Sequence, residues 1–108
     1  AAALTPFNLA YLHLMRADFF GMQQGDVVTA AREAYQGNLI GNMGYQKEEA
    51  EQALASGQLQ AVAVGAAFIA NPDLVERWQQ NWPLSAPDQS TFYTQDAKGY
   101  SDYPAYQA

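Results

Sequence analysis

The sequence predicts an α/β fold in which parallel strands alternate with helices. Three short and nearly continuous apolar runs lie at residues 9–15, 38–42 and 59–65, and a helical pattern follows each of them. Short apolar runs without polar alternation are typical of strands buried on both faces, as in parallel sheets. Alternation of such strands with helices implies right-handed crossovers between parallel neighbours.

Length and composition narrow the class of protein. The chain has 108 residues, enough for one modest domain and too few for a complete (β/α)₈ barrel of roughly 250 residues. Five Lys and Arg against eleven Asp and Glu give a formal net charge of −6, which argues against a nucleic-acid partner. The absence of cysteine excludes a disulfide framework and a cysteine nucleophile.

The segment at residues 1–6 is not expected to be a secretory signal, and no membrane-spanning run is expected in the sequence. No apolar run is long enough to cross a bilayer, and the segment at residues 1–6 has neither a basic region nor a long apolar core. We therefore expect no membrane partner and a cytoplasmic location.

The first strand–helix unit begins with the apolar run at 9–15. A loop is expected from Arg16 to Gly25, because glycines stand at positions 21 and 25 beside two adjacent glutamines. Thr29 is then expected to cap a short helix that runs to Gln36, with Gly37 as the residue after its end.

The second unit places a strand at 38–42 before a helix at 46–56. Ala50, Ala53 and Leu54 share one face at helical spacing, and Gly57 is expected to end the helix. The acidic residues at 48, 49 and 51 lie early in it, where the helix dipole favours negative charge. We interpret these acids as a solvated face rather than as a catalytic carboxylate pair.

The third unit follows the run at 59–65. The segment at 71–73, Asn-Pro-Asp, is a strong helix start, and Leu74, Val75 and Trp78 form the apolar stripe of that helix. From Pro83 onward the residues predict an extended tail that crosses a surface. An open three-stranded sheet of buried-type strands would expose two apolar edges, so we expect residues 1–108 to complete a larger sheet.

Two glycines are the leading candidates for a ligand site. Gly41 and Gly65 each end an apolar strand shortly before a helix start. Ligands of parallel α/β proteins gather at the carboxyl ends of strands, and phosphates bind backbone N–H groups at helix starts. In barrels the phosphate site often follows the last two strands. The alternative is that both glycines only permit tight turns.

Other polar and aromatic residues allow two interpretations each. His13 lies among apolar neighbours, which favours a hydrogen-bonded core histidine over a ligand. The serines lack a Gly-x-Ser-x-Gly context, so a hydrolase triad has no support. The tail tyrosines either pin the tail by packing or line a pocket for a flat ligand; they stand at positions 93, 100, 103 and 106.

Three segments of the chain carry specific motifs: Leu-Ala-Tyr-Leu-His-Leu at 9–14, Gly-Asn-Met-Gly-Tyr at 41–45, and Val-Gly-Ala-Ala-Phe-Ile-Ala-Asn-Pro-Asp-Leu at 64–74. Together they resemble successive signatures of the Old Yellow Enzyme family. The tail, with Thr-Phe-Tyr at 91–93 and Gly-Tyr-Ser-Asp-Tyr-Pro at 99–104, is similar to the C-terminal end of that family. The resemblance covers essentially the whole chain.

The resemblance implies a fold and a reaction. Family members are (β/α)₈ barrels that bind FMN, take hydride from NAD(P)H and pass it to an activated alkene such as an enone or a maleimide. This chain would supply strands six to eight and the C-terminal tail. Backbone around Gly41, Asn42 and Met43, and around Gly65 and Ala66, would hold the FMN phosphate. Tyr93 matches a family tyrosine near the substrate pocket.

Two features separate this chain from the family pattern. Many members have arginine where this chain has Ala66, so a charge-assisted phosphate contact is missing. The family's substrate-anchoring pair, its proton-donating tyrosine and its flavin-ring contacts lie on earlier strands. We therefore expect no catalytic residue and no metal site in this chain, and no activity from it alone.

The expected partner is the N-terminal part of the same barrel, supplied by another chain or another copy, as in a nicked, split or permuted barrel. The alternative from a different class is a non-catalytic α/β module, which would bind a phosphate ligand or act as a half-barrel scaffold. The substrate, the choice between NADH and NADPH, and the oligomeric state do not follow from these residues.

Overall fold

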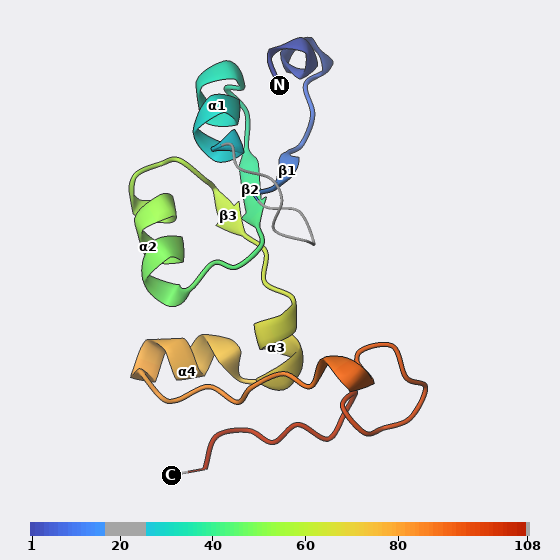
Figure 1. The fold of residues 1–108 in the computed structure, drawn as a ribbon. Coiled ribbons are helices and arrows are strands. Elements are labelled where there is room, and N and C mark those ends of the chain that lie inside the picture. The colour runs from blue at the N-terminus through green and yellow to red at the C-terminus, as the bar shows by residue number, and fades with distance from the viewer. Residues whose placement is uncertain (17–25, 108) are drawn as a thin grey trace. The chain divides into compact units, whose positions relative to one another are not determined.

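The computed structural model describes residues 1–16 and 26–107, and these divide into two compact units. The first unit spans Ala1–Ala63 and the second spans Val64–Ala108. The first unit contains a three-stranded parallel sheet with the order β1-β2-β3 (Figure 1). The predicted α/β class with parallel strands in chain order is therefore confirmed. The expected loop at 17–25 lies outside the described residues.

The strands are shorter than the apolar runs. They are β1 (Leu12–Met15), β2 (Leu39–Asn42) and β3 (Ala61–Val62), and a 3₁₀ helix, η1 (Ala2–Phe7), precedes them. Leu12 pairs with Leu39 and Ile40 pairs with Ala61. Residues ahead of Leu12 have no strand opposite them, and Tyr11 is more than half exposed.

The prediction that the first strand is buried on both faces is wrong for this chain. Residues of β1 alternate between half-buried and exposed, and His13 is one of the exposed ones. His13 is thus not a core histidine here. The physical reason is that β1 has one described neighbour, β2, so its other edge and one of its faces lack cover.

The helix α1 (Val27–Ala34) begins earlier than predicted. Asp26 caps it by accepting the Thr29 N–H at 3.1 Å, and the Thr29 hydroxyl donates to the same carboxylate at 2.7 Å. The N-cap residue is therefore Asp26, and Thr29 holds the Asp26 carboxylate in place. The helix ends at Tyr35, which turns to an extended backbone two residues before Gly37.

The helix α2 (Lys47–Ala55) agrees with the sequence pattern. Gly57 follows its C-cap with a φ of +77°, the left-handed conformation that ends many helices. Ala50 and Ala53 are buried as expected, whereas Leu54 is 44% exposed. The buried face of α2 is therefore narrower than predicted.

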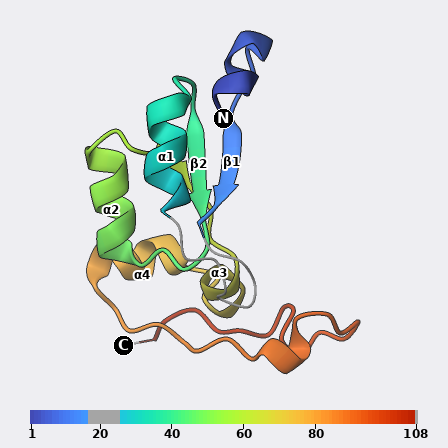
Figure 2. The ribbon, with the colours of Figure 1, turned by 45° about the horizontal axis from the view of Figure 1, so that its top comes forward.

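The core of the first unit lies between the sheet and its two helices. Figures 1 and 2 show α1 and α2 on the same side of the strands. The core joins side chains from α1, β2 and α2 with three from the connecting segments, and it consists of Val28, Ala31, Tyr35, Leu39, Tyr45, Ala50, Ala53 and Leu59. Among residues 1–16 and 26–63, no helix of this core covers the opposite face of the sheet.

The second unit begins with a helix that the sequence did not predict. This helix is α3 (Ala66–Ala70), and α4 (Leu74–Gln80) follows it after a short turn. The N-cap position of α4 is Asp73 rather than Asn71. Asn71 is buried instead, and its side chain bonds to the carbonyls of Ala67 and Ser85 and to the Ser85 N–H. In the expected stripe of α4, Leu74 is buried and Val75 is exposed.

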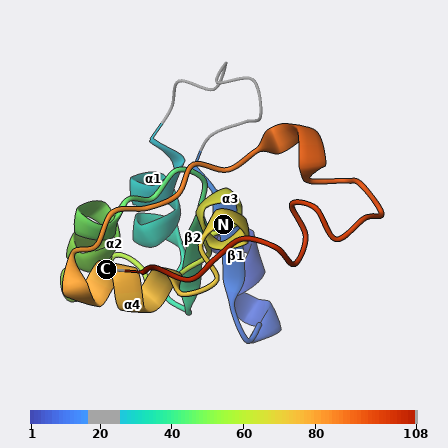
Figure 3. The same cartoon turned by 90° about the horizontal axis from the view of Figure 1, so that it is seen from below.

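The tail lacks regular secondary structure over residues 83–88 and 102–107, and between them it forms the 3₁₀ turn η2 (Gln89–Thr91) followed by turns and bends up to residue 101. The prediction of an extended tail is therefore confirmed only in part. Figure 3 shows it running away from α4 and returning, so that its last residues lie beside that helix. Trp82 stacks on Tyr106 with ring centroids 4.6 Å apart, and the Tyr103 hydroxyl accepts the Asp88 N–H at 2.9 Å. Two of the four tail tyrosines thus pin the tail.

Within the described part of the chain, none of the helices has the length and apolar character that a membrane crossing requires.

Candidate functional site

The loop at the carboxyl end of β2 holds two consecutive left-handed residues. Met43 has a φ of +83° and Gly44 a φ of +72°. The Met43 N–H donates to the Asn42 side-chain oxygen at 2.7 Å. A residue with a side chain rarely adopts such a φ, and surrounding contacts must hold it there. The loop predicted to hold a phosphate is therefore a strained and specifically supported piece of backbone.

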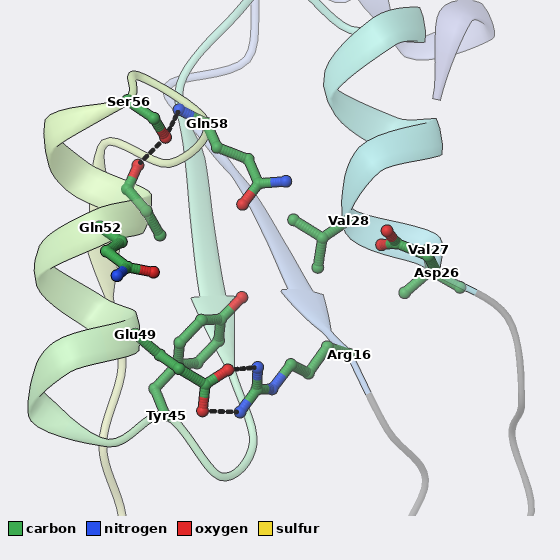
Figure 4. A pocket seen from close by; sticks show the side chains of 10 residues that line it. Arg16, Asp26, Val27, Val28, Tyr45, Glu49, Gln52, Ser56 and Gln58 are labelled. Atoms are coloured by element: carbon green, nitrogen blue, oxygen red, sulfur yellow. Dashed lines mark hydrogen bonds and ion pairs between the residues drawn. The ribbon is translucent and has the colours of Figure 1, made fainter.

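Arg16 supplies that support from the end of β1. Its Nε donates to the Met43 carbonyl at 2.7 Å, and its Nη2 donates to the Gly44 carbonyl at 2.8 Å. The same guanidinium forms a two-pronged ion pair with Glu49 of α2, with N–O distances of 2.6 and 3.1 Å (Figure 4). The hydrogen bond from Arg16 lowers the pKa of the Glu49 carboxyl, so the pair stays charged at neutral pH.

Tyr45 links this ion pair to the sheet. The guanidinium carbon of Arg16 lies 4.0 Å from the centre of the Tyr45 ring. The other side of the ring reaches Gly41, where an added Cβ would lie 2.9 Å from the Tyr45 hydroxyl and 2.5 Å from Leu59. Gly41 is therefore required for close packing inside β2, and its φ is not positive. Its role in the structure is steric rather than that of a turn.

A pocket of about 580 Å³ lies on the helix side of the first unit, between α1 and α2 (Figure 4). Arg16, Tyr45 and Glu49 line one end of it, and Asp26 and Gln58 line the other. None of the predicted phosphate residues lines this pocket. Among the described residues, no group of three or more metal-ligating side chains comes together.

Gly65 and Ala66 lie at the start of the second unit. Gly65 occupies the N-cap position of α3, and no side chain caps that helix. A Cβ added at Gly65 would meet no atom within 4 Å. The first N–H groups of any helix have no partner inside the helix. This stretch therefore offers accessible backbone donors, whereas Gly41 is enclosed.

Tyr93 also belongs to the second unit and follows η2. Its side chain is 91% exposed, and Tyr100 is 82% exposed. These two tyrosines do not pin the tail, in contrast to Tyr103 and Tyr106. Sequence reasoning placed Arg16 in a loop and assigned it no role, because its partners lie 27 to 33 positions away in the chain.

Known proteins match the chain over nearly its whole length. A protein from Leishmania infantum named "Probable flavin mononucleotide-dependent alkene reductase" is 46% identical over 90% of this chain and 26% of its own length. 12-Oxophytodienoate reductase 2 of Arabidopsis thaliana is 44% identical over 95% of this chain and 29% of its own length. No family model matches the sequence.

Solved structures give the same result for the backbone. The old yellow enzyme from Trypanosoma cruzi is 52% identical, with a TM-score of 0.91 over 96% of this chain and 28% of that protein. Morphinone reductase is 37% identical, with a TM-score of 0.84 over 97% of this chain and 29% of that protein. The matched segment is thus a run of parallel strand–helix units in oxidoreductases.

The chain belongs to the Old Yellow Enzyme family. It spans between a quarter and a third of the length of these relatives. The resemblance noted in the sequence is confirmed.

Proposed function

We propose that this chain is the C-terminal part of an FMN-dependent ene-reductase barrel and supplies its strands six, seven and eight. The observation that carries the proposal is the 52% identity and TM-score of 0.91 to an old yellow enzyme over 96% of the chain. In the proposed reaction, NAD(P)H is the reductant and an activated alkene, such as an enone or a maleimide, is the substrate. FMN supplies the hydride transfer when it is bound.

The proposed role of this chain is to bind the FMN phosphate through backbone. Gly65 and Ala66 fit that role because the space at the Gly65 Cβ is open and α3 lacks a capping side chain. Asn42, at the end of β2, and Met43, in the loop that follows, are proposed to contribute to the same role. Gly41 contributes by admitting the Tyr45 ring below that loop.

Tyr93 is proposed to contact the substrate. It is the tail tyrosine that corresponds to a pocket residue in the family pattern, and its almost complete exposure leaves the ring free to meet a ligand. The residues that anchor the substrate and donate the proton would come from the N-terminal part of the barrel. The chain alone is therefore proposed to be inactive, and that N-terminal part is its proposed partner.

A chimera tests the proposal directly. Joining the N-terminal part of the Trypanosoma cruzi old yellow enzyme to residues 1–108 gives what we call the completed barrel. We expect it to bind FMN, to show a flavin absorbance spectrum and to reduce an enone with NADPH. A folded, colourless chimera that binds a simple phosphate ester but no flavin would favour the non-catalytic module instead.

The phosphate assignment has its own test at Ala66. Replacing Ala66 with Arg in the completed barrel adds a cation beside the proposed phosphate and should tighten FMN by about tenfold, an effect that falls as salt rises. Ala66→Gln is the matched control, because it adds a side chain of polar character without charge. Equal FMN affinities for the parent and Ala66→Arg would contradict the assignment.

A further inference from the structure

One side chain contacts both left-handed residues of the loop after β2. Arg16 holds the carbonyls of Met43 and Gly44. The peptide plane of the Met43 carbonyl carries the Gly44 N–H, and that of the Gly44 carbonyl carries the Tyr45 N–H, so carbonyls held on one side fix the directions of these two N–H groups. Arg16 therefore sets the orientation of the Gly44 and Tyr45 donors, while the Met43 N–H is held by the Asn42 side chain.

Arg16 is not itself arranged as a phosphate ligand. Its Nε and both terminal nitrogens are engaged by two carbonyls and by the Glu49 carboxylate. The Glu49 charge also offsets the Arg16 charge at hydrogen-bond distance. The cation missing at position 66 is thus not replaced by Arg16 in this arrangement.

We propose that the Arg16–Glu49 pair is a positioning clamp that holds Asn42, Met43 and Gly44 in the backbone conformation that binds the FMN phosphate. The proposal rests on the function proposed above and adds two residues that act through the loop rather than on the flavin. Glu49 fixes the guanidinium plane from α2, and the Tyr45 ring supports its face at 4.0 Å. Contacts from the end of β1 and from α2 therefore hold the loop after β2 in one backbone conformation.

The first unit offers a matched arginine at the opposite ends of the strands. Arg32 of α1 donates to the carbonyls of Tyr35 and Gly37 before β2 and to the carbonyl of Gln58 before β3. It is half-buried and binds several loop carbonyls, as Arg16 does. Because these loops lie at the amino ends of the strands, Arg32 should not influence a ligand at the carboxyl ends.

The experiment compares FMN with riboflavin, which has the same ring and ribityl chain but no phosphate. Dissociation constants for both are measured in the completed barrel carrying Arg16→Lys, Arg16→Ala or Glu49→Gln. Each variant should weaken FMN about tenfold, a loss typical of residues that orient a ligand-binding group, and leave riboflavin affinity unchanged. Two control variants should leave the ratio of the FMN and riboflavin affinities unchanged. They are Arg32→Ala and Glu48→Gln, the second at an exposed acid next to Glu49 in α2.

The variants separate the clamp from two other roles. A residue that only stabilises the fold would weaken FMN and riboflavin equally, and that result would overturn the proposal. If Arg16 instead binds the phosphate directly, Glu49→Gln would release it and tighten FMN, and Arg16→Lys would retain binding; either outcome also overturns the clamp. If Arg16→Ala fails to fold, Arg16→Lys and Glu49→Gln still test the clamp, because both substitutions nearly keep the size of the side chain.

Failure of the proposed function gives a different pattern. If the parent barrel binds neither FMN nor riboflavin, the ene-reductase proposal fails. If the parent prefers FMN and the variants keep that preference in full, the clamp alone fails.

Discussion

Removing Arg77 should release the tail from α4. Arg77 is only 3% exposed and connects the helix to three places in the tail. It donates to the Pro83 carbonyl at 3.2 Å, the Ser85 hydroxyl at 3.3 Å and the Pro104 carbonyl at 2.9 Å. Arg77→Ala leaves these acceptors without their donor.

The size of the effect follows from those contacts. A hydrogen bond to a partly exposed acceptor contributes about 0.5–1.5 kcal/mol, so the two carbonyls, which belong to exposed residues, together predict a loss of about 2 kcal/mol in the local opening free energy of the tail. Since about 1.4 kcal/mol corresponds to a factor of ten, tail amides should exchange with deuterium roughly 30-fold faster.

Hydrogen exchange with mass spectrometry of the completed barrel measures this change in peptides from 83–107. Glu76→Ala, an exposed residue on the same helix, is the control and should leave tail exchange unaltered. If Arg77→Ala leaves the exchange rate of the tail amides unchanged, the hydrogen bonds from Arg77 contribute nothing to holding the tail, and the prediction is wrong.

Three further predictions concern other contacts. Gly41→Ala places a Cβ 2.5 Å from Leu59 and should lower the free energy of unfolding by about 1–3 kcal/mol in urea denaturation; parental stability would contradict that packing. The hydrogen bond from the Tyr106 N–H lowers the pKa of the Asp73 carboxyl, so its stabilisation of the tail is present above the ordinary aspartate pKa and is lost as pH falls through the lowered value. Tail exchange should therefore accelerate in that acidic range, and Asp73→Asn should remove this pH dependence. Tyr93→Ala should leave the melting temperature unchanged and raise KM for an enone in steady-state assays, and an unaltered KM would argue against a substrate contact.

The order of strands and helices could be predicted because it depends on local patterns. Apolar runs and helix-terminating glycines are recognised from residues that are neighbours in the sequence. Gly57, for example, ends α2 where its sequence position indicates. The N-cap of α1 was misplaced because Asp26 and Thr29 belong to the same class of capping residue and only geometry decides between them. The helix α3 was missed because five residues without a capping side chain carry almost no signal.

The phosphate site stays a prediction. The sequence places its two glycines at strand ends, whereas in the structure Gly41 lies inside β2 and Gly65 lies beyond the end of β3. The bonds from Arg16 to Met43 and Gly44 join residues far apart in the chain, and no spacing rule connects them. The different environments of Gly41 and Gly65, one enclosed and one open, likewise depend on tertiary packing.

The uncovered side of β1 has a practical consequence for producing this chain. Within the described sheet β1 pairs with β2 alone. Met15 is 48% exposed, and Tyr11 is 55% exposed. An unpaired strand edge with apolar side chains is a template for self-association. Expressed by itself, the chain should therefore aggregate. On the function proposed above, the N-terminal part of the barrel would cover that edge during synthesis, so co-expression with it should give a better yield than mixing separately purified parts.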